Sequence, residues 1–152
     1  MPPPQEFQRP KVAAQTETLH ATCVAVDGKG VLVLGASGAG KSALALNLLA
    51  HGAQLVADDR TILTRIQGQV MASCPPQILG LIEARGLGLL HADPILQAPI
   101  CLIVDLDNVE TERLPPKRRR DLLGVPIDLV FASTSRHFPV GLLQLLRSGR
   151  VD

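Results

Sequence analysis

The segment that most constrains the fold of this chain is residues 35–42, which read Gly-Ala-Ser-Gly-Ala-Gly-Lys-Ser. The segment follows the apolar run at residues 30–34 and leads into the leucine- and alanine-rich stretch at residues 43–50. Glycines at this spacing let backbone N–H groups turn inward around a phosphate, and the helix that follows presents its positive end to the same anion. The pattern therefore predicts a strand, a phosphate loop and a helix.

All eight residues of this loop are candidates for a nucleotide-binding site. Lys41 is expected to reach the β- and γ-phosphates, and Ser42 to offer its hydroxyl to Mg²⁺. The other six are expected to surround the phosphates with backbone N–H groups. They are Gly35, Ala36, Ser37, Gly38, Ala39 and Gly40.

The length of the chain, 152 residues, suffices for one domain with a hydrophobic core. We expect a single domain over residues 12–152, preceded by a poorly ordered arm at residues 1–11 that contains four prolines. A hydrophobic content of 46% and a charged content of 19% are typical of globular proteins rather than disordered ones.

Charge and residue usage exclude several classes of protein. The net charge is +1 and aromatic residues make up 2%, which argues against nucleic-acid binding by a basic surface or by base stacking. No apolar run has the length of a membrane span, and the first residues do not resemble a signal peptide. Cys23, Cys74 and Cys101 are widely spaced and indicate free thiols. The sequence predicts a soluble, cytoplasmic protein with no membrane or nucleic-acid partner.

Two adjacent carboxylates end the next predicted strand. We expect a strand at residues 19–26, a turn, the strand before the loop, a helix that ends near Gly52, and a short strand at residues 54–59. Asp58 and Asp59 form the carboxyl end of that last strand, where open α/β sheets bind ligands. One could face the γ-phosphate and the other the metal; the alternative is a charged turn. His20, at the start of the first strand, is by spacing alone a surface or half-buried polar residue.

Further along the chain, three patterns leave alternatives open. Glu83 and Arg85, two residues apart before a Gly-x-Gly, would project into a site or form an exposed ion pair. Asp105 ends a buried strand at residues 99–107 and competes for the metal role. A polar loop at residues 108–120 carries the basic run 117–120, which could bind a partner or the transferred phosphate, or could simply be solvated. A hairpin at residues 61–70, a strand at 127–132 and a terminal helix at 140–147 complete the expected elements.

Four segments together resemble a known family. Leu19-His20, residues 35–42, Leu-Val-Ala-Asp-Asp-Arg at 55–60 and Ile-Glu-Ala-Arg-Gly-Leu-Gly-Leu-Leu at 82–90 are similar, in this order, to the motifs of HPr kinase/phosphorylase. The resemblance covers roughly residues 18–115 and corresponds to the C-terminal catalytic domain of that family, as in its short forms.

The resemblance implies an α/β phosphate-loop kinase fold similar to phosphoenolpyruvate carboxykinase, with a mixed sheet and flanking helices. It also implies transfer of phosphate from ATP, with Mg²⁺, to a serine of HPr, the phosphocarrier of the sugar phosphotransferase system. Many members also run the reverse phosphorolysis, and the family forms hexamers, so a homo-oligomer is expected. Two alternatives stand beside this reading: a small-molecule kinase with the same loop, and a nucleotide-binding regulatory module.

The resemblance also implies roles for individual residues. His20 matches the active-site histidine, Lys41 the loop lysine, and the pair Asp58 and Asp59 the carboxylates that include the acid/base group. Asp105 becomes a structural or supporting residue under this reading. The remaining matches are Ser42 and Glu83 as Mg²⁺ ligands, Arg85 beside them, and Arg113 as the catalytic arginine.

Two positions depart from the family pattern. Ala43 stands where the family commonly has glutamate after the loop serine. The family segment Pro-Val-Arg-Pro-Gly-Arg-Asn, associated with dephosphorylation, is matched only by residues 138–141, Phe-Pro-Val-Gly, which contain no arginine.

Overall fold

The computed structural model describes residues 15–151, so the arm expected at residues 1–11 lies outside the described part of the chain. Its strands are β1 (Thr16–Leu19), β2 (Thr22–Val26), β3 (Lys29–Leu34), β4 (Gln54–Ala57), β5 (Thr61–Ile66), β6 (Gln69–Ser73), β7 (Leu81–Ala84), β8 (Gly88–His91), β9 (Gln97–Val109), β10 (Arg118–Leu122) and β11 (Val125–Ala132). Its helices are α1 (Lys41–Ala50) and α2 (Phe138–Ser148), with a short 3-10 helix, η2 (Pro76–Ile78).

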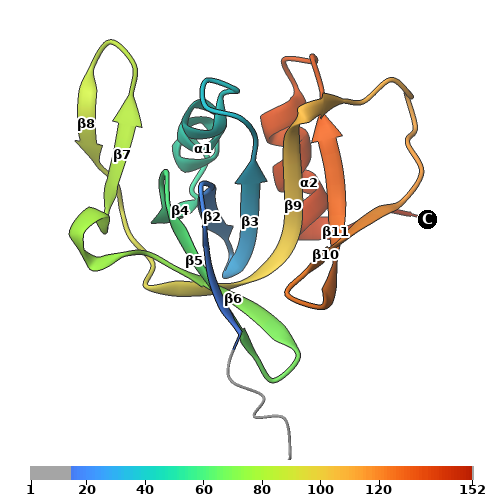
Figure 1. Ribbon diagram of the computed structural model, residues 1–152. Helices are drawn as coiled ribbons and strands as arrows, with labels where there is room; N and C mark the ends of the chain where they lie inside the picture. Colours follow the sequence, from blue (N-terminus) through green and yellow to red (C-terminus); the bar gives the residue numbers. More distant parts are fainter. Residues whose placement is uncertain (1–14, 152) are drawn as a thin grey trace, which may run out of the picture.

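Three parallel strands form the centre of the main sheet. β3 and β11 both pair with β9 in parallel, so that Val33 and Val130 flank Val104. On one side β2 and then β4 continue the sheet in antiparallel fashion, and on the other side β10 pairs antiparallel with β11. Because the three central strands run in one direction, their carboxyl ends meet at the same edge of the sheet, the upper edge in Figure 1. The phosphate loop lies at that edge.

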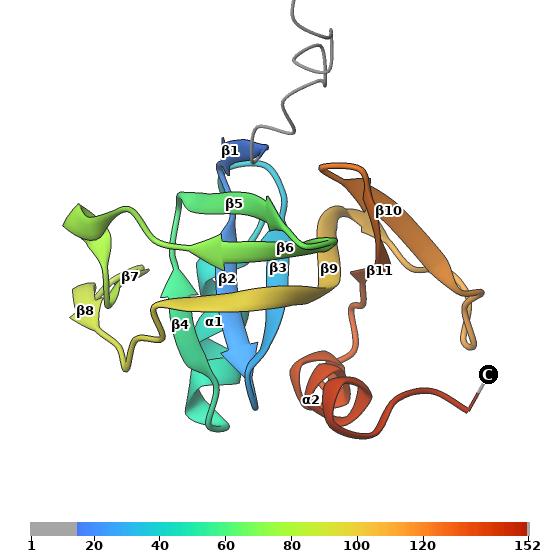
Figure 2. The same cartoon turned by 90° about the horizontal axis from the view of Figure 1, so that it is seen from below.

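A second layer of strands covers one face of this sheet. The first residues of the 13-residue strand β9 pair with β6, which pairs in turn with β5 and then β1. Figure 2 shows these strands on one side of β2, β3 and β9, with α2 on the other side. Leu32 and Ile103, on the covered face, pack with Leu63 and Val70 of the second layer, and all four are buried.

Both helices pack against the opposite face. Leu44 and Leu48 of α1 and Leu142 and Leu146 of α2 form one cluster with the apolar side chains of β2, β3 and β9. A fully buried leucine such as Leu48 stabilises the fold by roughly 1.5–3 kcal/mol relative to its exposed state. The mixed α/β sheet with flanking helices is therefore confirmed, and both described helices cover the same face.

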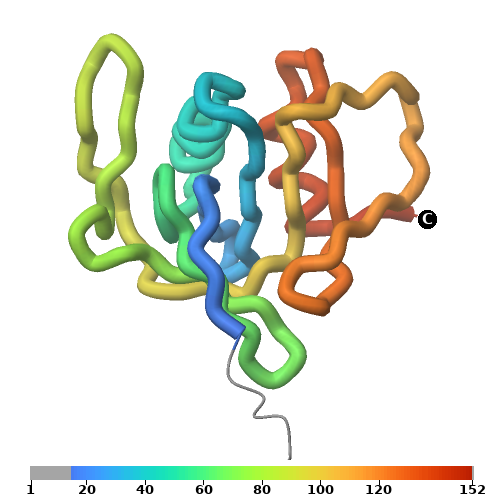
Figure 3. The backbone as a smooth tube through the Cα atoms, in the orientation of Figure 1, coloured from blue at the N-terminus to red at the C-terminus, as the bar shows by residue number. Residues whose placement is uncertain are grey.

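A two-stranded hairpin stands apart from the main sheet. β7 and β8 pair only with each other among the described strands, and the tube in Figure 3 shows them projecting beside the loop edge. Leu87 at the tip is 80% exposed and Leu89 is 65% exposed. The hairpin is thus held at its base, through β7, which packs against α1.

Two predictions about local structure were wrong. The expected strand at residues 19–26 breaks at His20, because β1 and β2 belong to different layers and pair with β5 and with β3. The loop expected at residues 108–120 is shorter than predicted, because strands occupy both of its ends. β9 continues to Val109, and residues 118–120 lie in β10. Cross-strand partners explain the second difference, since Arg119 pairs with Asp128 at 3.4 Å and Arg118 lies 4.3 Å from the ring centre of Phe131.

The other predicted elements are present with shifts of a few residues at their ends. The β5–β6 hairpin turns at Gln67 and Gly68, which have φ values of 50° and 78°. α1 ends at Ala50, followed by Gly52 with a φ of 97°. Neither of the two α-helices within residues 15–151 has the length and apolar character needed to cross a membrane.

Candidate phosphate-transfer site

The phosphate loop is positioned between β3 and the first turn of α1. Gly38 and Gly40 have φ values of 86° and 102°, in the left-handed region that favours glycine. The Lys41 side chain, which is buried, turns back across the loop and donates from Nζ to the carbonyl oxygens of Gly35 at 2.7 Å and Ala36 at 3.1 Å. The loop thus holds one cation at its centre, beside exposed backbone at residues 36–40.

The end of β9 braces the start of this loop. The backbone N–H of Ala36 donates to Oδ1 of Asp107 at 2.9 Å. Asp105 in turn accepts from the backbone N–H of Asp107 at 2.9 Å and from Nδ2 of Asn108 at 2.7 Å. Among the described residues, the hydrogen bonds of the Asp105 side chain lie within its own strand end, and none joins it to Ser42.

Asp58 is the buried carboxylate of the site, and it joins three elements. Its Oδ1 accepts a 2.7 Å hydrogen bond from the hydroxyl of Ser42 and a 2.9 Å hydrogen bond from the hydroxyl of Thr22. Its Oδ2 accepts a 3.0 Å hydrogen bond from the backbone N–H of Glu83. Since Asp58 is only 5% exposed, these donors replace the water that a carboxylate needs. Asp58 links the phosphate loop to β2 and β7.

Asp59, the next residue, faces solvent and pairs with His20. Oδ1 of Asp59 lies 2.7 Å from Nε2 of His20, and the two side chains are 61% and 54% exposed. Asp59 has a φ of 69°, and the N–H of Arg60 donates to the carbonyl oxygen of Asp58 at 2.7 Å. This tight turn sends two consecutive carboxylates in different directions, one into the protein and one outward.

The strand register explains why His20 and Asp59 meet although 39 positions separate them. β2 pairs with β4 so that Cys23 lies opposite Ala57, and β1 pairs with β5 so that Leu19 lies opposite Thr61. The hydroxyl of Thr61 also donates to the carbonyl oxygen of Ala21 at 2.9 Å. The break after β1 and the turn after β4 are therefore held side by side.

Glu83 and Arg85 both reach the site, although not as an ion pair with each other. Nη2 of Arg85 lies 3.8 Å from the position that a Cβ on Gly38 would occupy, so this guanidinium borders the loop. Glu83 contacts Asp58 through its backbone N–H, while its side chain is exposed on β7. The sequence left two interpretations open for Glu83 and Arg85: projection into a site, or an exposed ion pair. In the described part of the chain the two side chains form no ion pair with each other.

Hollows flank the loop on two sides. A cavity of about 410 Å³ is lined by His20, Gly35, Asp105, Asp107 and Arg120, among others. A second cavity, of about 380 Å³, lies beside the start of α1. Its lining includes Gly40, Leu44, Asn47, Arg136 and Phe138.

The structure does not place Arg113 at the phosphate loop. Arg113 lies between β9 and β10 and lines a cavity of about 340 Å³ with Glu110 and residues of α2. That cavity shares Ser133, Ser135 and Phe138 with the one beside α1. Arg113 is therefore separated from the other sequence-predicted residues in the described structure.

Sequence reasoning missed Thr22 and did not single out Arg120. Thr22 is a hydroxyl residue inside the otherwise apolar strand β2, and it is fully buried. A single hydroxyl residue in an otherwise apolar strand was the sequence signal that could have identified Thr22, because a buried hydroxyl needs a hydrogen-bond partner. Arg120 belonged to the basic run, but only the β10–β11 pairing shows that it lines a cavity of the site.

The donor chemistry of the site fits Mg²⁺, which prefers a few protein oxygens and substrate phosphates to a complete protein cage. Ser42 and Asp58 supply a hydroxyl and a carboxylate in direct contact, and Glu83, whose backbone N–H donates to Asp58, carries a second, exposed carboxylate on β7. No cluster of three or more His, Cys, Asp or Glu side chains suited to a metal was found in residues 15–151.

Comparison with known proteins identifies this arrangement. Residues 11–127 match the family model described as HPr Serine kinase C-terminal domain. The chain belongs to this family. The structure is similar to that of the Hpr(Ser) kinase/phosphatase from Coxiella burnetii, with a TM-score of 0.74 and 27% sequence identity, over 89% of this chain and 97% of that chain.

Curated relatives of the family agree with this assignment. The HPr kinase/phosphorylase of Ralstonia nicotianae is 39% identical in an alignment of 132 positions, which covers 79% of this chain and 41% of the relative. That of Bordetella petrii is 40% identical in an alignment of 130 positions, which covers 77% of this chain and 42% of the relative. The chain thus spans about two fifths of the length of these relatives.

Proposed function

We propose that this chain is a Mg²⁺- and ATP-dependent kinase that phosphorylates a serine of HPr. One observation carries the proposal: a solvent-facing carboxylate–imidazole pair, Asp59 and His20, adjoins a phosphate loop whose serine is already held by Asp58. The names of the relatives, HPr kinase/phosphorylase, support HPr as the acceptor.

The two hollows beside the loop support a placement for the two substrates. With the triphosphate on residues 35–42, the nucleoside would occupy the cavity at the start of α1, which offers Leu44 and Phe138 as apolar surface and Asn47 as a polar group. The acceptor serine would approach from the side of His20, where the second cavity opens. Donor and acceptor would then meet over the loop.

The different environments of the two aspartates support a division of labour. Asp58 is buried and accepts three hydrogen bonds, so we assign it to holding Ser42 and the metal. Asp59 is exposed and keeps free acceptor capacity, so we assign it as the base. Its hydrogen bond with His20 would orient the carboxylate toward the acceptor.

The transfer itself is a displacement at phosphorus. The acceptor serine oxygen forms a bond to the γ-phosphorus, the bond from that phosphorus to the β,γ-bridging oxygen breaks, and the serine proton passes to Asp59. ADP leaves with the bonding electron pair. A hydroxyl is a poor nucleophile, and a base within hydrogen-bond reach contributes roughly 10²–10⁴-fold in rate.

Positive charge around the loop would stabilise the transferring phosphoryl group, which is the main source of catalysis in this reaction class. Lys41 already lies across the loop, and Arg85 borders it at Gly38. A bound Mg²⁺ would supply further charge neutralisation at the β- and γ-phosphates. We keep Arg113 in the proposal as a third cation, which requires movement of the segment between β9 and β10 toward the loop.

Two further parts of the proposal follow from the family. Reverse phosphorolysis would use the same groups, with inorganic phosphate as attacking nucleophile and Asp59 returning the proton to serine. We also expect the chain to form a homo-oligomer, specifically a hexamer. Light scattering on the purified protein would measure the mass of the assembly. A small-molecule kinase and a non-catalytic nucleotide-binding module remain the competing functions.

The test is a phosphoryl-transfer assay with the purified protein, Mg²⁺, γ-labelled ATP and HPr, with the modified residue located by mass spectrometry. We expect label on one serine of HPr and loss of at least about 10²-fold of the rate in Asp59→Asn, with nucleotide affinity retained. Asp27→Asn is the matched control. Asp27 is another exposed aspartate with positive φ (51°) and an ion pair, but it lies in the β2–β3 turn, at the opposite end of β3 from the loop.

Each outcome decides between the competing functions. Label on HPr that is lost in Asp59→Asn and kept in Asp27→Asn supports the kinase. Nucleotide binding with no label on HPr contradicts HPr as acceptor and leaves the other two functions. Label on HPr that persists in Asp59→Asn and disappears in Asp58→Asn reverses the assignment of the two aspartates.

A further inference from the structure

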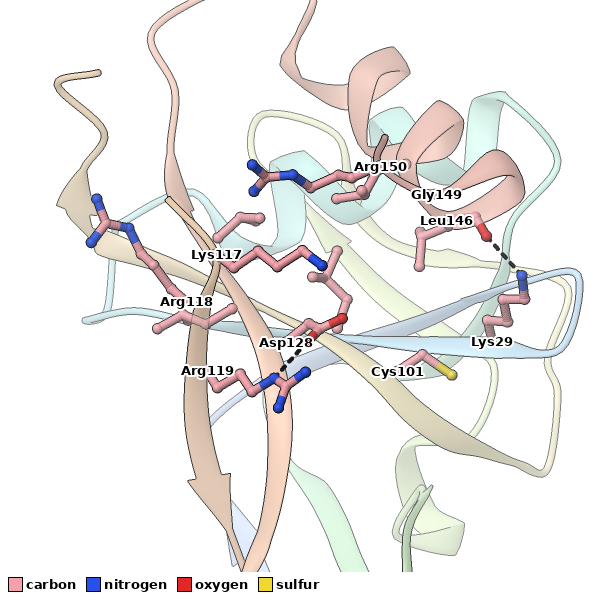
Figure 4. A pocket seen from close by; sticks show the side chains of 13 residues that line it. Lys29, Cys101, Lys117, Arg118, Arg119, Asp128, Leu146, Gly149 and Arg150 are labelled. Atoms are coloured by element: carbon pink, nitrogen blue, oxygen red, sulfur yellow. Dashed lines mark hydrogen bonds and ion pairs between the residues drawn. The ribbon is translucent and has the colours of Figure 1, made fainter. Parts of the chain in front are cut away.

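Four arginine side chains have no partner in the part of the chain that the structure describes. Other arginines serve the fold: Figure 4 shows Arg119 of β10, which pairs with Asp128 of β11 at 3.4 Å. The four without an ion pair, side-chain hydrogen bond or ring contact within residues 15–151 are Arg85, Arg113, Arg120 and Arg136. A guanidinium is always charged and carries five N–H donors, so each of the four keeps its full capacity for a ligand.

Arg136 lies beside the phosphate loop, on the side of α1 and α2. It belongs to the connection between β11 and α2, and β11 ends at the same edge of the sheet as β3, which leads into the loop (Figure 1). Arg136 lines the cavity of about 380 Å³ at the start of α1, and Ala39 and Gly40 of the loop line the same cavity. The cavity therefore continues directly from the phosphate loop.

The turn that carries Arg136 is held by hydrogen bonds on both sides of it. The backbone N–H of Ser135 donates to Oγ of Ser133 at 3.1 Å, and the backbone N–H of His137 donates to Oγ of Ser135 at 3.1 Å. The backbone N–H of Phe138 donates to the carbonyl oxygen of Ser135, also at 3.1 Å. The backbone of Arg136 is thus fixed at the cavity, while its side chain is exposed.

The lining of this cavity suits a nucleoside better than a bare anion. Among the described residues that line it, Arg136 is the only charged one. Leu44 is buried, and Leu106 and Phe138 are half-buried, so the cavity has an apolar wall. Such a wall gains from contact with a ring, which an inorganic phosphate does not offer. Asn47 adds a polar group to the lining.

Contact with the face of a base, rather than with its edge, is what these side chains offer. The chain has no Trp and no Tyr. Of the described phenylalanines, Phe131 is covered by the Arg118 guanidinium, 4.3 Å from its ring centre, whereas Phe138 lines the cavity. A guanidinium is planar and stacks on aromatic faces. Arg136, two positions before Phe138, therefore brings a second flat group to the same cavity.

We propose that Arg136 binds the nucleoside of the phosphate donor, by contact of its guanidinium with the face of the base. This assignment rests on the proposed function, since it takes the phosphates of the nucleotide to lie on residues 35–42. Arg136 then sets the affinity for the nucleotide and does not act on the transferring phosphoryl group, which lies at the other end of the triphosphate. Its role differs in this respect from the role assigned to Arg113.

The experiment compares two diphosphates, of which only one carries a nucleoside. Titration calorimetry on the full chain with Mg²⁺ measures the dissociation constants of ADP and of pyrophosphate, for the natural protein and for Arg136→Gln. We expect Arg136→Gln to weaken ADP binding by about threefold to tenfold, as loss of a cation–π contact implies. Pyrophosphate binding should stay within about twofold, because salt at about 0.15 M screens any long-range effect of the lost charge.

Arg147→Gln is the matched control, because Arg147 is another exposed arginine, on α2, that pairs with Asp27 at 3.3 Å and does not line the cavity. It should leave both affinities unchanged. Unchanged ADP binding in Arg136→Gln, an equal loss for ADP and pyrophosphate, or an equal loss of ADP binding in both variants would each overturn the assignment and leave the proposed kinase standing.

The titration contains no HPr, so a failure of HPr to become labelled does not affect its result. Weaker ADP binding in Arg136→Gln with unchanged pyrophosphate binding supports the assignment even if the acceptor is another molecule. A natural protein that binds pyrophosphate but no ADP would overturn both the assignment and ATP as the phosphate donor.

Discussion

The hydroxyl of Ser42 donates a 2.7 Å hydrogen bond to Oδ1 of Asp58, which also accepts from Thr22 at 2.9 Å. The first residues of α1 are thereby tied to the end of β4 and to β2. Because all three groups are buried or half-buried, the position of Asp58 depends on both hydroxyls. This relationship makes Thr22 a positioning residue for the proposed transfer.

Thr22→Val should lower kcat by about tenfold while the KM for ATP changes little, because the γ-hydroxyl is lost but the volume is kept. Loss of one buried hydrogen bond should also reduce the free energy of unfolding by about 1–3 kcal/mol. Steady-state kinetics and urea unfolding measure the two effects. Thr22→Ser, which restores the hydroxyl, should recover kcat; a kcat that stays low in Thr22→Ser would show that packing matters and the hydrogen bond does not.

Arg85 and Arg113 should give different kinetic effects, because the structure places only Arg85 at the loop. Arg85→Ala should weaken Mg·ATP binding, since a cation beside Gly38 is present before any movement of the chain. Arg113→Ala should reduce kcat by about 10²-fold or more with nucleotide affinity unchanged, as expected of a cation that acts on the transferring group. Titration calorimetry and turnover measurements separate the two; an unchanged kcat in Arg113→Ala would exclude Arg113 from catalysis.

Gly30→Ala should destabilise the fold without touching the site. A Cβ at Gly30 would lie 2.7 Å from the carbonyl oxygen of Pro99, because β3 approaches β9 closely there. Overpacking of this kind costs about 1–3 kcal/mol of the free energy of unfolding. Thermal unfolding measures the loss. Gly141→Ala is the comparison, since a Cβ there meets no atom within 4 Å, and an equal loss in both variants would contradict the argument.

Acid should weaken the attachment of β10 to the end of β9. Hydrogen bonds from Arg118 hold the pKa of the Glu110 carboxyl below its ordinary range in the folded state. A lowered folded pKa adds stability above the unfolded pKa, and that stability is lost as the pH falls through the folded value. The melting temperature of the natural protein should therefore fall more steeply than that of Glu110→Gln across the acid range below the ordinary glutamate pKa; parallel curves would contradict this.

The three cysteines should differ in reactivity toward iodoacetamide. Cys101 is exposed, whereas burial raises the pKa of the Cys23 thiol and, with a smaller contribution from nearby Asp58, that of Cys74. Because the thiolate is the reactive form, Cys101 should label first and Cys23 only on unfolding. Peptide mass spectrometry over time measures the order, and early labelling of Cys23 would show that β2 opens in the native state.

Local patterns in the sequence were sufficient for the elements whose signals are confined to a few neighbouring residues. The strand before residues 35–42, the loop itself, α1 and the β5–β6 turn each depend on glycine conformations and apolar periodicity within about a dozen residues. Their positions agree closely with the structure. The sequence motifs were also sufficient to assign the family, because four of them occur in the right order.

Tertiary structure alone decided how these parts meet. The pairing of β2 with β4 and of β1 with β5 brings His20 to Asp59 across 39 positions, and no local pattern encodes such a register. The same holds for β10, whose arginines appear solvated in the sequence but pair across strands with β11. It holds also for the different directions of Asp58 and Asp59, which differ in burial because β4 ends at Ala57 and the chain turns at Asp59, where φ is 69°. Side-chain environment is a property of long-range contacts, and these are settled only when the sheet closes.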